Sequence, residues 1–352
     1  MNKFLIVFVY LFAATNGSVI NSHEWDEYKK KGSWNLNDER VLLIPQSKYS
    51  KKYQNQADDR LHMGIFLQNK NEVMRHNQLF NEGIVSFTMS LNAYSDLSHT
   101  EFVSQMNGVR YDGSSASRNT TFDEPSPLMQ LVHAVLPKSI DWRTKGAVTN
   151  VEAQGKCLSC WAFSVLGTVE AQIFRKTGRL VQLSAQNLVD CANSKNKCQP
   201  KSIHKAFDYI KRNGLETARS YPYRGDSGLC RYNSRNSAVT IKGYKDLPEG
   251  DETSLQQAIA NIGPISVCVD ASHKSFQHYS NGIYYEPKCR RNNKYLHHAV
   301  LVVGFGTDKR GKEYYIIKNS WGRSWGENGY MRLARNRKNH CGVATVPAFP
   351  IL

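Results

Sequence analysis

The chain has 352 residues, a hydrophobic content of 40% and a formal net charge of +16 with a pI of about 9.4. The length exceeds one average domain, and this hydrophobic content excludes wholesale disorder. A basic balance allows polyanion binding, but the charge is dispersed, with small clusters at 288–294 and 335–338, and no nucleic-acid motif is present. We interpret most of it as a solvated basic surface and expect no nucleic-acid partner, with polyanion binding as the alternative.

Residues 1–17 have the pattern of a secretory signal peptide. Lys3 gives a positive start, an apolar run follows from Phe4 to Ala14, and small residues continue to Gly17. The run is too short to span a bilayer, and nothing later is long and apolar enough to anchor the chain. We therefore expect no membrane insertion, folding in the oxidising secretory pathway, and a lysosomal or extracellular destination.

Two segments precede the globular part. Residues 18–108 are polar and mostly helical in pattern, and residues 109–135 form a linker rich in Gly, Ser, Asn, Thr and Pro with a glycosylation sequon at Asn119. Spacings of three and four predict one helical face, formed by Ile65, Phe66, Asn69, Val73, Met74 and Asn77.

From residue 136 to 352 the composition is that of a packed globule. The predicted helices cover 160–177, 184–191, 202–214 and 251–262. The predicted strands cover 265–269, 299–303 and 314–317. Helices first and strands later favour an α+β protein with two lobes and a cleft between them.

Among the eight cysteines, only Cys157 and Cys160 lie close together. A Cys-x-x-Cys pair could be half a zinc site, but no second pair or correctly spaced histidines complete it. We expect no metal and no cofactor, and disulfides together with free thiols suit a secreted chain better.

Cys160 begins a predicted helix, where free N–H groups and the positive helix end favour a thiolate. The alternative is a buried or disulfide-bonded cysteine. His298 follows 138 residues later at the start of a strand, and Asn319 ends the next strand. An imidazole can take the thiol proton, and an amide can fix the ring's orientation, so these three residues are candidate catalytic groups.

Several motifs carry a family resemblance over nearly the whole chain. They are Ile140–Arg143, Gln154–Phe163, Leu183–Cys191, Gly263–Val267, Lys318–Gly322 and Trp325–Tyr330. With them, the chain resembles the cathepsin L group of the papain family of cysteine proteases. The resemblance implies a cysteine endopeptidase with a papain-like fold, whose helical lobe faces a β-barrel-like lobe. It also implies that Gln154 and the Cys160 N–H form the oxyanion hole.

The same resemblance implies further roles. Disulfides are expected between Cys157 and Cys198, Cys191 and Cys230, and Cys289 and Cys341. The main specificity pocket is expected to be lined by aliphatic groups and one thiol, namely Ile203, Cys268, Leu296 and Val346. Cys268 has the alternative of a small core residue. The other expected substrate contacts are Leu158, Trp161, Lys201, His297 and Trp321.

The N-terminal segment is similar to the family's inhibitory propeptide, which makes the chain a zymogen. The matching positions are Asp58, His62, Phe66, Asn69, Val73, Asn77, Asn92, Tyr94 and Asp96. In the family this segment crosses the cleft in the reverse direction to substrate, and acid weakens the contact. We expect a monomeric mature chain starting near Leu136 or Pro137. Its expected partners are protein or peptide substrates, its own propeptide and cystatin-like inhibitors.

Three departures from the family pattern fall in the cleft. Leu158 replaces a glycine and should crowd the cleft, Pro200-Lys201 replaces a Gly-Gly pair and should restrict the approach of substrate, and His297 replaces Asp or Asn. A positive φ at Pro200 or Lys201 would be strained. Two hypotheses remain: an active endopeptidase, or a catalytically impaired papain-fold binding protein.

Overall fold

The computed structural model describes residues 22–31, 51–110, 135–192 and 198–352. The expected signal peptide, the sequon at Asn119 and most of the 109–135 linker lie outside these residues. No helix in the described ranges is both long and apolar enough to cross a membrane.

The helical lobe is built around α6 (Cys160–Thr177), beside α7 (Ala185–Cys191) and α8 (Ile203–Asn213). All three predicted helices are confirmed, since Ser184 and Ser202 cap α7 and α8 and a left-handed Gly178 ends α6. The short pair β3 (Leu215–Glu216) and β4 (Ser237–Val239) and the 3-10 turn η1 (Ser234–Asn236) complete this lobe.

The second lobe is a sheet with the strand order β1-β7-β10-β9-β8-β6-β11-β5, to which β2 is added on β8. Its strands are β1 (Phe87–Met89), β2 (Ile140–Asp141), β5 (Gly243–Asp246), β6 (Ile265–Val269), β7 (Tyr279–Tyr284), β8 (His298–Thr307), β9 (Glu313–Lys318), β10 (Tyr330–Ala334) and β11 (Ala348–Ile351). The helices α9 (Glu252–Asn261) and α10 (Lys274–Gln277) and the turns η2 (Asn293–Tyr295) and η3 (His340–Gly342) lie between them in the chain. The lobe confirms the predicted strands and the helix capped by Asp251.

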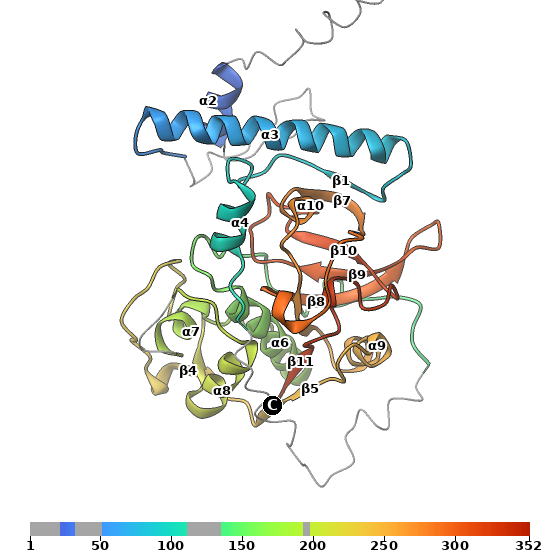
Figure 1. Ribbon diagram of the computed structural model, residues 1–352. Helices are drawn as coiled ribbons and strands as arrows, with labels where there is room; N and C mark the ends of the chain where they lie inside the picture. The colour runs from blue at the N-terminus through green and yellow to red at the C-terminus, as the bar shows by residue number, and fades with distance from the viewer. Residues whose placement is uncertain (1–21, 32–50, 111–134, 193–197) are drawn as a thin grey trace, which may run out of the picture.

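The two lobes meet along α6. Figure 1 shows α7 and α8 on one side, the strands β7–β10 on the other, and α6 between them. The buried residues of α6 include Trp161, Val165 and Val169, and α6 packs on β6, β8 and β11. This contact places the first residue of α6 beside the first residue of β8.

The N-terminal segment, residues 22–31 and 51–110, covers one end of this body (Figure 1). Its helices are α2 (Ser22–Lys31), α3 (Gln56–Asn81) and α4 (His99–Met106). It also supplies β1, which pairs antiparallel with β7 and was not predicted. The predicted face of α3 is confirmed for Phe66, Asn69 and Val73 but wrong for Met74, which is 54% exposed because the buried stripe is narrower than the spacing suggested.

A buried carboxylate organises this segment. Asp96 accepts hydrogen bonds from Tyr28 Oη (2.8 Å), Lys51 Nζ (2.8 Å) and Tyr53 Oη (2.7 Å). Two amide side chains hold the neighbouring backbone, as Asn69 donates to Ser95 O and Asn92 donates to Gln277 O. Hydrogen bonds to a carboxylate such as Asp96 are stronger than those between neutral groups, so they fix the fold within the segment. The bond from Asn92 fixes the segment on the second lobe.

Candidate active site

Cys160 is the first residue of α6 and is completely buried. The first turn of a helix has N–H groups without intrahelical partners, and its dipole is positive there. The Cys160 thiol lies against the backbone N–H groups of Ala299, Gly108 and Trp161. Ala299 follows His298 in β8, so this contact brings the thiol to the strand end that carries the candidate base.

His298 is oriented by two neighbours. Its Nε2 lies 2.8 Å from Asn319 Oδ1, and its ring stacks on Trp321 with centroids 4.4 Å apart. Because the amide oxygen only accepts, Nε2 carries the hydrogen and Nδ1 is left as the basic nitrogen. Nδ1 has no hydrogen-bond partner among the described residues, so it is available for the thiol proton.

Gln154 is held on both ends of its amide. Its Oε1 accepts from Ser320 Oγ at 2.7 Å, while its Nε2 donates to Met106 O at 3.0 Å. A backbone bond from Gln154 N to Ser320 O fixes the residue further. The amide N–H is thus fixed as a donor to a carbonyl oxygen in the cleft, and here that carbonyl belongs to the N-terminal segment.

The N-terminal segment runs along the cleft after α4. Lys201 N donates to Gly108 O (3.0 Å) and Lys201 O accepts from Arg110 N (3.4 Å), while Val109 N donates to His297 O (2.8 Å). Lys201 thus bonds to both Gly108 and Arg110, and one residue bonded to two residues on either side of its neighbour is the pattern of parallel strands. A Cβ on Gly108 would lie 2.2 Å from Leu158 O, so only glycine fits at this approach.

Burial keeps the reacting groups neutral in this state. It raises the pKa of the Cys160 thiol to about 11, although the surrounding N–H groups act in the opposite direction. It lowers the pKa of His298 to about 4, against the opposing effect of the Asn319 hydrogen bond. A thiol and a neutral imidazole, without an ion pair, are the favoured forms while the segment is seated.

Comparison with known proteins identifies the family to which this chain belongs. Residues 136–351 match the model of the papain family cysteine proteases. The chain belongs to the papain family. Residues 46–102 match the cathepsin propeptide inhibitor domain, I29. This papain-family chain is therefore a cathepsin L-like cysteine endopeptidase made as a zymogen, and its N-terminal segment is the inhibitory propeptide.

Individual relatives agree over most of the length. The chain is 42% identical to a cathepsin L-like peptidase of Aedes aegypti, over 99% of this chain and 100% of the relative. It is 43% identical to cathepsin L of Sarcophaga peregrina, over 98% and 97%. Among solved structures, digestive procathepsin L 3 of Tenebrio molitor matches with a TM-score of 0.76 and 38% identity, over 86% of this chain and 95% of that one.

The residues expected to line the papain-family specificity pocket lie together. Ile203, Cys268 and Leu296 share one buried cluster with Cys160, and Val346 packs against it. Val109 of the propeptide belongs to the same cluster and is 7% exposed. The propeptide therefore adds an aliphatic side chain to the buried cluster that contains these residues.

The departures in the cleft do not prevent backbone pairing. Lys201 makes both backbone bonds, and His297 contributes its carbonyl oxygen. Neither Pro200 nor Lys201 has a positive φ, so the strain considered for them is absent. The propeptide backbone still approaches the Leu158 carbonyl closely at Gly108, and the Leu158 side chain is partly exposed. None of these contacts supports the hypothesis of a catalytically impaired binding protein.

Lys201 has a side chain that the sequence did not place. It is 7% exposed, and its Nζ lies 4.9 Å from the centre of the Trp161 ring. Burial lowers its pKa to about 8. The long side chain folds back onto the ring of Trp161, the residue after Cys160, which explains how a lysine fits where a glycine was expected.

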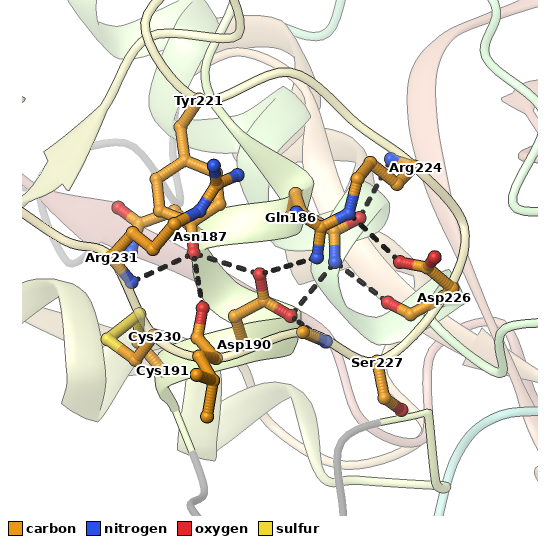
Figure 2. Close-up of polar contacts among 12 residues, drawn as sticks. Gln186, Asn187, Asp190, Cys191, Tyr221, Arg224, Asp226, Ser227, Cys230 and Arg231 are labelled. Atoms are coloured by element: carbon orange, nitrogen blue, oxygen red, sulfur yellow. Dashed lines mark hydrogen bonds and ion pairs between the residues drawn. A yellow bond between two sulfur atoms is a disulfide. The ribbon is translucent and has the colours of Figure 1, made fainter.

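The structure contains the three expected disulfides, and Cys160 and Cys268 are free. Beside Cys191–Cys230, the buried Asp190 accepts from Tyr221 Oη and Gly228 N, both at 2.8 Å (Figure 2). Gln186 and Arg224 complete this network from α7 and the loop that follows residue 221.

This network holds Tyr223, a residue that sequence reasoning missed. The Tyr223 hydroxyl donates to Gln154 O at 2.7 Å and lies 2.7 Å from Ser159 Oγ. It therefore connects Gln154 to Ser159, the residue before Cys160. The run Tyr221-Pro222-Tyr223 near Cys230 was its only sequence signal, and nothing in that run indicated contact with the cleft.

Proposed function

We propose that Cys160 is the nucleophile, His298 the general base and acid, Asn319 the orienting amide and Gln154 an oxyanion donor. The hydrogen bond from His298 Nε2 to Asn319 Oδ1 carries the proposal, because it leaves Nδ1 free to accept the thiol proton. The thiolate attacks the scissile carbonyl carbon, and the resulting oxyanion accepts hydrogen bonds from Gln154 Nε2 and the Cys160 N–H.

The second half of the reaction returns the enzyme to its starting form. The imidazolium gives its proton to the leaving amine, which departs and leaves a thioester on Cys160. A water then loses a proton to His298 and attacks the thioester, and the carboxylic acid product leaves with the thiolate restored. One removed oxyanion donor costs about 3 kcal/mol of barrier, so Gln154→Ala should lower kcat by about 10²-fold.

The zymogen boundaries are also part of the proposal. We assign 1–17 to the signal peptide, 18–135 to the propeptide and 136–352 to the peptidase. Val135 is 96% exposed and Pro137 to Ser139 are exposed, which supports cleavage near Leu136 or Pro137. The disulfides support passage through the secretory pathway to lysosomes or the extracellular space.

Substrate preference follows from the pocket around Val109. A pocket lined by Ile203, Cys268 and Leu296 fits an aliphatic or aromatic side chain two positions before the scissile bond. We expect the mature monomer to accept cystatin-like inhibitors in the same cleft.

The test uses the acid-matured enzyme. The wild type should cleave peptides carrying such a side chain and should be labelled at Cys160 by an epoxide thiol inhibitor. The variant His298→Ala, matured in trans by an added protease, should lose at least about 10⁴-fold in kcat, while His204→Ala at the start of α8, where the side chain is partly buried and bonds Asp246, should keep its activity. Cleavage by His298→Ala at the rate of His204→Ala would refute the assignment.

A further inference from the structure

Two surface loops carry basic side chains that the proteolytic mechanism does not use. One loop spans residues 288–294 and the other spans 335–341. A disulfide between Cys289 and Cys341 joins them, and Arg291 Nη1 donates to Lys338 O at 2.8 Å. The exposed members form what we call the linked basic surface, namely Lys288, Arg290, Arg291, Lys294, Arg337 and Lys338.

This surface is not neutralised by neighbouring acids. Among the described residues, only Arg290 of the six has a carboxylate partner, Asp270 at 3.1 Å. The peptidase portion, residues 136–352, holds 33 of the 46 Lys and Arg and 16 of the 30 Asp and Glu, which is a net +17. Residues 1–135 have a net charge of −1, so the basic character belongs to the peptidase.

The second loop is fixed by its backbone. Asn336, Lys338, Asn339 and Cys341 all have a positive φ, between 52° and 58°, which is uncommon for residues other than glycine. Glu252 holds the loop from α9 by accepting from Asn336 N and Asn339 N, both at 2.7 Å. Such conformations persist only where the surroundings over-determine them, so the backbone presents its charges in a fixed arrangement.

An aromatic ring directly follows the first loop in the chain. The Tyr295 ring has the Arg290 guanidinium 4.0 Å and the Lys294 Nζ 4.9 Å from its centre. Tyr295 ends η2, and the chain continues through Leu296 to His297, whose carbonyl binds the propeptide in the cleft. The linked basic surface therefore adjoins the substrate cleft.

We propose that the linked basic surface binds a sulfated polysaccharide. A polymer with regularly spaced anions can contact both loops at once, and each contact releases counterions. The chemistry favours sulfate over an acidic peptide, because carboxylates of Asp and Glu become neutral near pH 4 while sulfate esters stay charged. A bound polymer lies beside the cleft and holds the protease on a sulfated matrix.

The experiment uses the zymogen with Cys160→Ala, which cannot cleave itself, and measures its binding to immobilised heparin as a function of salt, at about pH 4 and at neutral pH. This protein should stay bound at about 0.15 M salt, with an affinity that falls linearly on a log–log plot, and the surface variants are made in the same background. Each of the variants Arg337→Gln/Lys338→Gln and Lys288→Gln/Lys294→Gln should weaken binding at least about tenfold and lower the slope by about two. The two pairs are read separately, so the proposal stays testable if one fails to fold.

The matched control is Lys211→Gln/Arg212→Gln at the exposed end of α8, which removes the same charge from the other lobe. It should change the affinity less than about twofold. An equal loss in the control would show attraction to net charge alone and would overturn the proposal. Binding of polyglutamate as tight as that of heparin at about pH 4 would overturn the choice of a sulfated partner.

Discussion

Gly108 offers a single-atom test of how the propeptide blocks the cleft. A Cβ added there would lie 2.2 Å from Leu158 O and 2.5 Å from Leu158 C, and both are backbone atoms that cannot rotate away. Gly108 does not have a positive φ, so Gly108→Ala introduces the clash without backbone strain. The propeptide must lift from Leu158 to relieve it.

The cost follows from the bonds that the lift breaks. The propeptide makes three backbone hydrogen bonds here, with Lys201 and His297, and a fourth to the Gln154 amide. Each contributes about 1 kcal/mol net, and partial relaxation leaves a loss of about 2–4 kcal/mol. That loss weakens the seating of the propeptide by about 30- to 1,000-fold.

The assay is the rate at which a thiol reagent labels Cys160 in the uncleaved zymogen at neutral pH, together with the pH at which self-cleavage begins. Gly108→Ala should be labelled faster and should mature at higher pH than wild type. Gly64→Ala is the matched control, because an added Cβ at this position in α3 meets nothing within 4 Å. Equal latency of Gly108→Ala and Gly64→Ala would refute the reasoning.

Three further changes test other parts of the zymogen. Asp96→Asn leaves the donors around this side chain without a charged acceptor, so the seated propeptide should lose about 3 kcal/mol of stability. The measurement is the time at which self-cleavage begins after acidification, which should be earlier than in wild type. Unchanged timing would contradict this. Burial lowers the pKa of His278 to about 4 despite nearby Glu72, and the His278 carbonyl oxygen accepts a hydrogen bond from Ser90 N of the propeptide. The seated propeptide should therefore be fully stable above about pH 6.5. Its free energy of seating should fall by about 1.4 kcal/mol per pH unit as the pH falls from there towards 4. His278→Leu should therefore need more acid for maturation, and an unchanged pH profile would count against that role. Asn319→Ala should lower kcat by about 10²-fold with little change in KM, because it loosens His298 without touching substrate.

The sequence predicted what local patterns control. Helix limits followed from caps such as Ser184 and Ser202, and three strands of the second lobe, β6, β8 and β9, followed from short apolar runs. The residues of the site were found through motifs, since neither periodicity nor composition brings Cys160 to His298. The structure supplied what depends on tertiary contact: β1 on β7, Tyr223 against Gln154, and the exposed position of Met74.

The fate of the cleft departures also depends on tertiary contact. Pro200-Lys201 looked restrictive because the sequence does not show backbone angles or the path of a long side chain. In the fold, Lys201 keeps a negative φ, pairs with Gly108 and covers Trp161. The close approach of Gly108 to the Leu158 backbone is likewise a tertiary contact that the sequence does not show.

With the propeptide seated, burial favours the neutral forms of Cys160 and His298, and we expect these groups to ionise when the cleft opens. The direct measurement is the alkylation rate of Cys160 between about pH 4 and 9, followed by peptide mass spectrometry, in the zymogen and in the matured enzyme. Rapid reaction of the matured enzyme from about pH 5, with negligible reaction of the zymogen across the range, is the predicted result. Identical pH profiles for the two forms would contradict the claim.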